Sequence, residues 1–303
     1  MNGQEFYAPL HVPPQIRAFD SETRQLGVGK SGKNGLLQVG LRLDSGKTVL
    51  AEAYSEIPLH VQRVLRCGDP LAYLYMVSAS GGILQGDRYR IDISMGRDSR
   101  AHITTQGATR IYGMDSNCAT QVVNVRLEEG AYLELVPDQI IPYRDSRFYQ
   151  ETSLDVHGES TMVYSEMVAP GRVGMGESFE YDACCLRMTA RDQHGAYRMI
   201  DSACMEPKKR TMSGFGVMGG YGIVGTVYVL TPARYVPEIC KKVNSILADS
   251  EVFGGATIAR DDAGLLVRML GNRTEQMRDA VFGVVGAVRE RVIGVPFSEI
   301  RKS

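Results

Sequence analysis

Hydrophobic and polar residues alternate in short runs along most of the chain. Between residues 88 and 93 an apolar side chain stands at every second position, at Tyr89, Ile91 and Ile93, with charged residues between them. A period of two is typical of a strand with one buried face. Comparable runs recur at short spacing, and we expect strands at 36–43, 49–54, 71–78, 89–93, 101–105, 108–112, 121–127, 132–136, 152–156, 161–167, 177–182, 186–190 and 196–201.

Glycines bracket many of these runs, most clearly in the stretch 80–112. There Gly81, Gly82 and Gly86 flank short β-segments. Because glycine has no Cβ, such positions indicate an unusual backbone conformation or the close approach of another segment.

The pattern changes near residue 222. A strand at 223–230 is followed by a run with apolar residues at helical spacing, then by two further strands and a second helical run. We expect a helix over 235–248, strands over 252–260 and 264–270, and a helix over 274–293. Asn272 or Thr274 is the expected cap of the last helix, and Gly294 and Pro296 are expected to end it.

These elements predict a mainly β protein. We expect layered, largely antiparallel β-sheets with a C-terminal α/β subregion that carries two helices, because strands dominate and do not alternate with helices. No internal repeat or low-complexity linker divides the chain. We therefore expect a single domain over residues 1–303, made of an irregular N-terminal segment (1–35), a β-rich body (36–221) and a strand-helix-strand-strand-helix subregion (222–303).

Composition does not indicate a nucleic-acid-binding or membrane protein. The 303 residues include 34 lysines and arginines and 35 aspartates and glutamates, which gives a net charge of −1 and a pI near 6.5. The sequence therefore lacks the excess of basic residues that is typical of nucleic-acid-binding proteins. No apolar run approaches the ~18 residues of a membrane span, and the N-terminus lacks a signal-peptide core. We expect a cytoplasmic protein with neither nucleic-acid nor membrane partners.

Two glycine-rich motifs resemble nucleotide-binding loops but do not meet their requirements. The run GVGKSGK at 27–33 lacks the first glycine of a P-loop, and a strand rather than a helix is expected after it. The run GFGVMG at 214–219 matches G-x-G-x-x-G, but it follows a basic loop and leads into a strand. A dinucleotide fingerprint has to leave a strand and open a helix, so we interpret this run as a mobile, glycine-rich connection.

A third glycine-rich segment, GRVGMGE at 171–177, ends in a carboxylate. Three glycines precede Glu177, so its side chain can stand free in a concave site. An equally acceptable interpretation is a bulge followed by a surface glutamate. The five histidines and six cysteines show neither H-x-H nor C-x-x-C spacing, so no stable metal site is indicated.

Several longer motifs together resemble one family, the urease accessory protein UreD, which is called UreH in some bacteria. They are SGGILQGDRYRIDI (80–93), ITTQGATRIY (103–112), the run from ATQVVNV to DSRFYQ (119–150), SEMVAPGRVGMGESF (165–179), PLHVQR (58–63) and the C-terminal stretch from LGNRTEQ to GVPF. The resemblance covers about residues 36–300. The sequence departs from it at the C-terminus, which lacks an Arg-x-Trp-like tail, and residues 1–35 match no family motif.

The resemblance implies a non-enzymatic chaperone with a β-rich fold and two helices. Members of the family act with urease accessory proteins F and G, the latter a GTPase, on urease apoprotein. They assist the insertion of nickel into the urease active site, and an internal tunnel has been proposed as the nickel path. We therefore expect no stably bound cofactor and only transient Ni²⁺.

By their place in the motifs, four residues are candidates for contact with nickel in transit: Asp87, Glu177, Glu166 and His102. Carboxylates, carbonyls and water hold a borderline divalent ion more weakly than clustered thiolates and imidazoles, which suits transfer rather than storage. For Asp87 the alternative is a turn carboxylate that accepts hydrogen bonds from nearby backbone amides.

Two other classes of function compete with the chaperone hypothesis. A β-rich hydrolase could use Asp87 with a second carboxylate as an acid–base pair. A purely structural scaffold could bridge proteins without contacting metal, and exposed apolar patches on the C-terminal helices would favour bridging.

Overall fold

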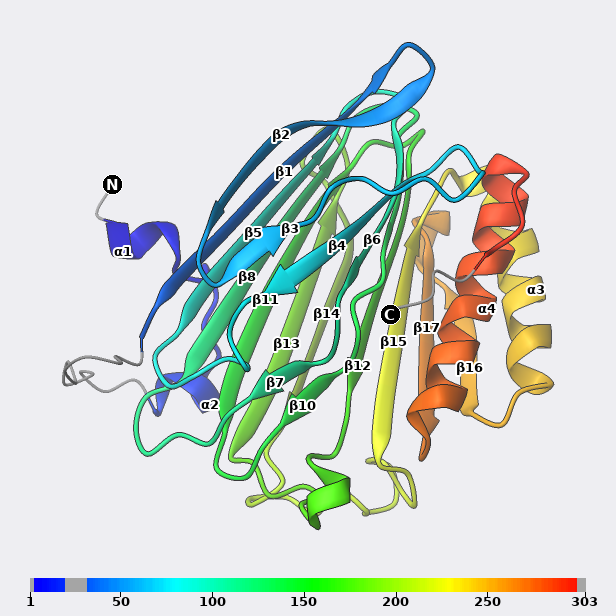
Figure 1. The fold of residues 1–303 in the computed structure, drawn as a ribbon. Helices are drawn as coiled ribbons and strands as arrows, with labels where there is room; N and C mark the ends of the chain where they lie inside the picture. Colours follow the sequence, from blue (N-terminus) through cyan, green and yellow to red (C-terminus); the bar gives the residue numbers. More distant parts are fainter. Residues whose placement is uncertain (1–2, 20–31, 299–303) are drawn as a thin grey trace.

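Two β-sheets pack face to face, and two helices cover the outer face of one of them (Figure 1). The computed structural model describes residues 3–19 and 32–298. The seven-stranded sheet has the strand order β14-β13-β11-β8-β5-β1-β2, formed by β1 (Asn34–Asp44), β2 (Lys47–Glu56), β5 (Arg88–Met95), β8 (Ala119–Leu127), β11 (Arg147–Val156), β13 (Ala183–Arg191) and β14 (Tyr197–Met205).

The ten-stranded sheet carries the helices. Its main order is β16-β17-β15-β12-β9-β6-β4-β3, and β10 pairs with both β12 and β7. Its strands are β3 (Leu59–Val61), β4 (Ala72–Ser78), β6 (Arg100–Thr105), β7 (Thr109–Ile111), β9 (Tyr132–Leu135), β10 (Ile140–Pro142), β12 (Thr161–Val168), β15 (Ile223–Leu230), β16 (Phe253–Ile258) and β17 (Leu265–Gly271).

Helices α3 (Val236–Ala248) and α4 (Thr274–Ile293) lie side by side on the outer face of this sheet. Their apolar residues form one cluster with those that β12, β15 and β17 point toward the helices. Glycines in the sheet let α4 approach closely, because a Cβ on Gly271 would lie 2.7 Å from the sulfur of Met277. The described residues also include three short 3₁₀ turns: η1 (Val173–Met175), η2 (Ala233–Tyr235) and η3 (Arg260–Asp262).

From β5 to β13 the chain repeatedly crosses from one sheet to the other. Strands β5, β8, β11 and β13 belong to the seven-stranded sheet, while β6, β9 and β12, which intervene in sequence, belong to the ten-stranded sheet. Because the chain returns to each sheet in the same direction, these neighbours are parallel.

The expectation of a mainly β, layered fold with two C-terminal helices is confirmed, but that of largely antiparallel sheets is wrong for the centre of both sheets. Short gaps between strands suggested hairpins, whereas a short turn can equally connect strands in two facing sheets. Antiparallel pairs occur toward the margins, at β1–β2, β3–β4, β12–β15, β13–β14, β15–β17 and β16–β17.

Two local expectations also differ from the structure. Residues 177–182, expected as a strand, form an irregular connection after η1. The α4 cap position is held by Arg273 without a side-chain cap, because Asn272 instead accepts a hydrogen bond from the Gly222 amide. Gly294 ends α4 in the left-handed conformation, as expected.

The N-terminal residues lie against the outer face of the seven-stranded sheet. They hold two one-turn helices, α1 (Gly3–Phe6) and α2 (Pro14–Arg17). Ile16 is fully buried against Tyr149 and Cys185, and the Glu151 carboxylate accepts a hydrogen bond from the His11 amide. Most of the GVGKSGK run (27–31) and the C-terminal residues 299–303 lie outside the described residues, and a strand, β1, follows that run.

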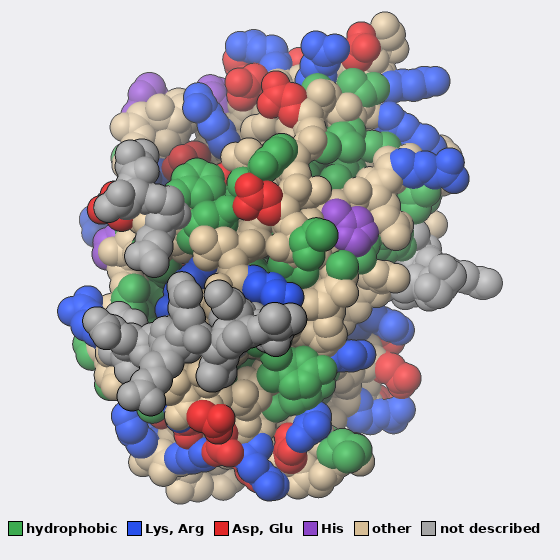
Figure 2. All heavy atoms as spheres, turned by 60° about the vertical axis from the view of Figure 1, so that its left-hand side comes forward, with side chains coloured by type: hydrophobic (Ala, Val, Ile, Leu, Met, Phe, Trp, Pro, Cys, Tyr) green, Lys and Arg blue, Asp and Glu red, His purple; other side chains and the backbone are tan. Residues whose placement is uncertain are grey.

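The outer face near the N-terminal segment is polar and mixed in charge. Figure 2 shows Lys and Arg side chains interspersed with Asp and Glu, with small hydrophobic areas between them. Among the described residues, no helix is long and apolar enough to cross a membrane.

Gly82 provides a test of the close approach that the sequence indicated. A Cβ at this position would lie 2.6 Å from the Arg110 carbonyl oxygen and 2.6 Å from the Tyr112 ring. We expect Gly82→Ala to lower the free energy of unfolding by roughly 1–3 kcal/mol through overpacking, measured by denaturant titration. Gly107→Ala is the control, because a Cβ at Gly107 would meet open space, with no neighbour within 4 Å. Equal stability of the two variants would contradict the proposed crowding.

Candidate functional site

Successive side chains of β12 point to opposite faces of the sheet, and this alternation places a carboxylate between the two sheets. Met162, Tyr164 and Val168 belong to the core between the sheets, whereas Val163 and Met167 belong to the cluster under the helices. Glu166 lies an even number of positions from Met162, Tyr164 and Val168, so its side chain points to the same face, into the interior. It is 6% exposed. An ionisable group at such a position is costly unless it is hydrogen-bonded.

Neutral polar side chains surround Glu166. Tyr164 Oη donates to Glu166 Oε1 at 2.8 Å and Gln150 Nε2 donates to the same atom at 3.2 Å, while Tyr228 Oη lies 3.5 Å from Oε2. Burial raises the pKa of Glu166 to about 7, and these hydrogen bonds only partly oppose that effect.

Polar contacts extend from Glu166 toward both sides of the molecule. On one side Gln121 Nε2 donates to Gln150 Oε1 at 2.8 Å. On the other, Tyr228 Oη donates to Asp201 Oδ2 at 2.7 Å, and Arg268 Nη2 donates to the same carboxylate at 2.6 Å. A row of polar side chains therefore crosses an otherwise apolar core.

Glu166 also lines two separate cavities. The first, of about 260 Å³, is bounded by the 80–83 and 105–110 segments and by Gln121 and Gln150. The second, of about 370 Å³, is bounded by β14, β15 and the 206–218 segment, and contains Tyr228 in its wall. Glu166 is therefore a carboxylate that both cavities share.

Asp87 is placed as a turn carboxylate, as the alternative interpretation expected. Its Oδ1 accepts from the Lys33 amide at 2.9 Å, and its Oδ2 accepts from the Leu84 amide at 2.9 Å and from Tyr89 Oη at 3.1 Å. Asp87 is almost fully buried, so these contacts fix the turn that precedes β5.

Glu177 does not stand free in a concave site, because it is ion-paired. Arg172 Nε donates to Glu177 Oε2 at 2.8 Å, and the Arg172 Nη2 group also contacts Oε1. The hydrogen bond from Arg172 lowers the pKa of Glu177. Arg172 in turn lies over the Tyr143 ring, with its guanidinium carbon 4.3 Å from the ring centre.

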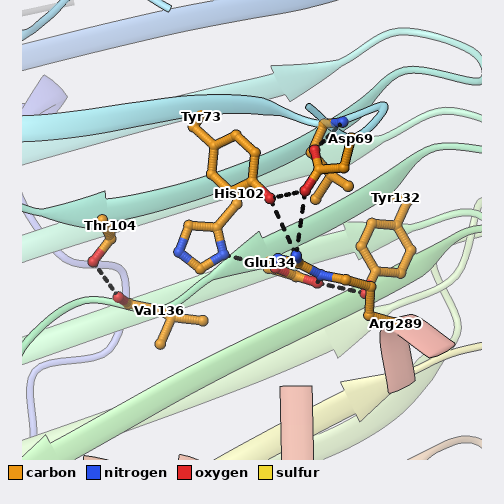
Figure 3. A network of polar contacts seen from close by, with 9 residues as sticks. Asp69, Tyr73, His102, Thr104, Tyr132, Glu134, Val136 and Arg289 are labelled. Carbon is orange, nitrogen blue, oxygen red and sulfur yellow. Dashed lines mark hydrogen bonds and ion pairs between the residues drawn. The ribbon is translucent and has the colours of Figure 1, made fainter. Parts of the chain in front are cut away.

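His102 belongs to a buried network that connects the ten-stranded sheet to α4 (Figure 3). Its Nδ1 lies 2.6 Å from Glu134 Oε2, and Arg289 Nε of α4 donates to Glu134 Oε1 at 2.8 Å. Burial alone would raise the pKa of Glu134, but the hydrogen bonds from Arg289 and His102 outweigh it and lower the pKa. Asp69 also contacts Arg289, which is fully buried.

The four sequence candidates therefore lie in four different surroundings and do not form one cluster. In the part of the chain that the structure describes, no three His, Cys, Asp or Glu side chains gather as a metal-binding group. Of the four, Glu166 alone lines both of the interior cavities described above. The assignment of these residues to a nickel path stays a prediction.

The sequence motifs did not point to the polar neighbours of Glu166. In β11, Phe148, Leu154 and Val156 face the core between the sheets, and Gln150 and Thr152 share their register. Gln150 and Thr152 are polar residues at positions where the alternation predicts buried, apolar ones. This pattern is present in the sequence and indicates a polar site in the interior. The partners on β14, β15 and β17 carry no such signal, because their proximity depends on the packing of the sheets.

The raised pKa of Glu166 makes stability depend on pH. Above its ordinary value of 4.5 the carboxyl ionises in the unfolded chain, whereas the folded chain keeps the proton up to about pH 7. The folded state therefore binds more protons in this window, and the contribution of Glu166 to the free energy of unfolding falls as pH rises from about 4.5 to about 7.

Glu166→Gln removes this dependence. We expect the variant to gain stability over the natural chain between pH 5 and pH 7, by on the order of 1–3 kcal/mol, with no further gain at pH 8. Urea titrations at pH 5, 6, 7 and 8 provide the measurement. Parallel stability profiles for the two proteins would contradict the raised pKa.

The sequence matches known proteins over most of its length. The family model described as UreD urease accessory protein matches residues 33–302. The urease accessory protein UreD of Cenarchaeum symbiosum (strain A) is 42% identical over 282 residues, which cover 92% of this chain and 99% of that protein.

Bacterial proteins are also similar. Urease accessory protein UreD 2 of Brucella suis biovar 1 (strain 1330) is 35% identical, over 94% of this chain and 96% of its own length. Urease accessory protein UreD of Photorhabdus laumondii subsp. laumondii is 33% identical, over 94% of this chain and 91% of its own length. The resemblance found in the sequence motifs is confirmed. The chain belongs to the UreD family of urease accessory proteins, which are accessory factors and not catalysts.

Proposed function

We propose that this chain assists the insertion of nickel into urease. It acts in the cytoplasm with urease accessory proteins F and G, the latter a GTPase, and binds urease apoprotein. Nickel is cargo in this proposal and no cofactor is held stably. The ion moves through the space between the two sheets, past Glu166.

The observation that carries this proposal is the position of Glu166 between two cavities. One carboxylate with neutral hydroxyl and amide neighbours offers oxygen ligands of moderate strength. A divalent ion of borderline softness binds such oxygens less tightly than it binds a group of thiolates or imidazoles. The donor set therefore suits brief contact followed by release.

The other candidate residues would need a rearrangement to meet the ion. Arg172 competes for Glu177, while His102 faces Glu134 within a buried ion network. Asp87 already accepts three hydrogen bonds, from the Lys33 amide, from the Leu84 amide of its own turn and from Tyr89 Oη. These contacts also leave the hydrolase hypothesis without support, because within the described residues neither Asp87 oxygen is paired with a second carboxyl group.

A scaffold that bridges proteins without touching metal is the remaining alternative. The outward faces of α3 and α4 are polar in the described structure, and the exposed large apolar residues lie elsewhere, so the helices do not favour that alternative. A variant that keeps every protein contact but loses nickel transfer separates the two hypotheses.

The test is co-expression of urease with proteins F and G, with and without this chain, under limiting nickel. We expect Glu166→Gln to lower the nickel content of purified urease by roughly tenfold, the scale on which metal-positioning groups act. Nickel per urease is measured by mass spectrometry, and partner recovery is measured on the same affinity-purified complex. Full loading of urease with nickel in the absence of this chain would contradict the proposal.

Thr152→Val is the matched control. Thr152 Oγ1 lies 3.1 Å from Tyr164 Oη, so this variant loses a hydrogen bond in the same polar group but retains the carboxylate. We expect it to load urease to nearly the natural level. Equal losses for Thr152→Val and Glu166→Gln would show that packing, and not the carboxylate, matters at this site.

Glu177 gives a second test at another position of the proposed path. We expect Glu177→Ala to fold and to bind the partners but to lower urease activation. Removal of Glu177 also frees Arg172, so Arg172→Ala is assayed in parallel to separate the carboxylate from its ion pair. Unimpaired activation by Glu177→Ala would exclude Glu177 from the path.

A further inference from the structure

Two cysteines face each other at the edge of the seven-stranded sheet. Cys185 of β13 and Cys204 of β14 are directly opposite each other in the antiparallel pair, and a disulfide joins them. They are 19 residues apart in the sequence, so no short motif marks the pair. Because β14 is an edge strand, the bond connects it to its one neighbour in that sheet.

The two members of the pair differ in exposure. Cys185 is buried, whereas Cys204 is exposed to solvent. Exchange between thiols and disulfides begins with the attack of a thiolate on an accessible sulfur. A dissolved thiol can therefore reach Cys204, and Cys185 is then the leaving group. Cys184 differs from both, because it lies in the core and burial raises the pKa of its thiol to about 12.

A cationic group lies on the same face of β13 as Cys185. Arg187 is two positions further along the strand, so the two side chains point the same way. The Nε atom of Arg187 is buried and has no hydrogen-bond partner among the described residues. Glu151, the acid in register with Arg187 on β11, accepts hydrogen bonds from the Leu10 and His11 amides. A nearby guanidinium favours the thiolate form of a cysteine, which suits Cys185 as a leaving group.

The N-terminal segment (residues 3–19) covers the pair. Ile16 is fully buried in a cluster with Tyr149 and Cys185. Gln15, the residue before it, lines the second cavity together with Cys204. Residues of α2 therefore lie beside both cysteines.

We infer that Cys185 and Cys204 form a reversible thiol–disulfide exchange site for a low-molecular-weight thiol of the glutathione class, and that the bonded pair holds the N-terminal segment against the sheet. This inference goes beyond the proposed function and takes from it only the cytoplasmic location. In that compartment permanent disulfides are rare, and those that form are usually transient and redox-sensing.

Two equivalents of the small thiol balance the reaction. A thiolate attacks the Cys204 sulfur and forms a mixed disulfide, while the bond to Cys185 breaks with its electron pair on Cys185, which takes up a proton. A second thiolate attacks the sulfur of the bound small thiol, so Cys204 leaves as a thiolate and is protonated in turn. The pair gains two electrons and two protons, and the small thiols are oxidised to their disulfide. That disulfide drives the reverse reaction.

Reduction disturbs the packing of the N-terminal segment. Two separate thiols need more room than two bonded sulfurs. Ile16 has no exposed surface and packs against Cys185, so a shift of the Cys185 sulfur perturbs this contact. The hydrogen bonds from the Leu10 and His11 amides to Glu151 are present in either state. The reduced chain should therefore have a loosened segment and an intact sandwich.

The first experiment titrates the purified full-length chain with glutathione. The chain is equilibrated at stepwise ratios of reduced to oxidised glutathione and quenched with acid, and free thiols are alkylated in denaturant and mapped by mass spectrometry. We expect Cys185 and Cys204 to become alkylated together as the ratio rises, with a glutathione adduct on Cys204 at intermediate ratios. Cys184 is the internal reference and should be alkylated at every ratio.

Two results of this titration overturn the inference. The pair could stay bonded in a large excess of reduced glutathione, which would make it a permanent structural link. It could instead stay as free thiols in a large excess of oxidised glutathione, which would show that the bond does not form in solution. An adduct on Cys185 in place of Cys204 would contradict the assigned point of attack.

Hydrogen exchange of residues 3–19 measures the coupling to the N-terminal segment. The Ile16 amide donates to the Pro13 carbonyl at 3.0 Å, and the His11 amide donates to Glu151. We expect both amides to exchange several-fold faster in the reduced chain than in the oxidised chain, because local opening becomes less costly. Equal exchange in the two states would overturn the proposed hold on the segment.

Two serine variants complete the test. Cys204→Ser cannot form the bond, so it should show the fast exchange at every glutathione ratio. Cys240→Ser is the matched control, because Cys240 is a free, partly buried cysteine of α3, and this variant should respond to glutathione as the natural chain does. All of these measurements use the chain without urease or nickel, so their failure is distinct from a failure of nickel loading.

Discussion

The alternation of side chains along β12 is the constraint on which the interior of this protein depends. It directs Tyr164, Glu166 and Val168 toward the opposite sheet, so a carboxylate has to be accommodated in an apolar core. The neighbouring strands respond with neutral donors, Gln150 and Tyr228 among them. Burial raises the pKa of Glu166, and the hydrogen bonds from these donors oppose that effect only in part.

In a second buried carboxylate, Glu134, the pKa is lowered and not raised. Glu134 faces the helices and is paired with Arg289 and His102, so it stays ionised and connects α4 to the ten-stranded sheet. Loss of one partner of such a pair is costly because it leaves an unpaired buried charge. The sandwich thus holds one carboxylate, Glu134, that is paired with cationic groups and suits a structural role, and another, Glu166, whose hydrogen-bond partners Gln150, Tyr164 and Tyr228 are neutral.

The second cavity and two glycine-rich loops are neighbouring parts of one architecture. The loops 169–182 and 206–222 gather at one end of the molecule, because β12 and β14 end there and β13 and β15 begin there. That end carries the exposed side chains of Met175 and Phe215 and the wall of the second cavity.

The sequence by itself determined the local elements and the family. Period-two runs located the main strands, helical spacing located 274–293, and the motifs containing Asp87 and Glu166 identified the UreD family. Strand direction could not be inferred, because a short turn serves a hairpin and a crossing between sheets equally well. The ion pair of Arg172 with Glu177, the His102–Glu134 contact and the meeting of Glu166 with Tyr228 were decided only by the tertiary structure. The last two contacts join residues 32 and 62 positions apart, so they depend on how distant segments pack. The first joins residues five positions apart, but it depends on the conformation of an irregular loop, which residue order does not record.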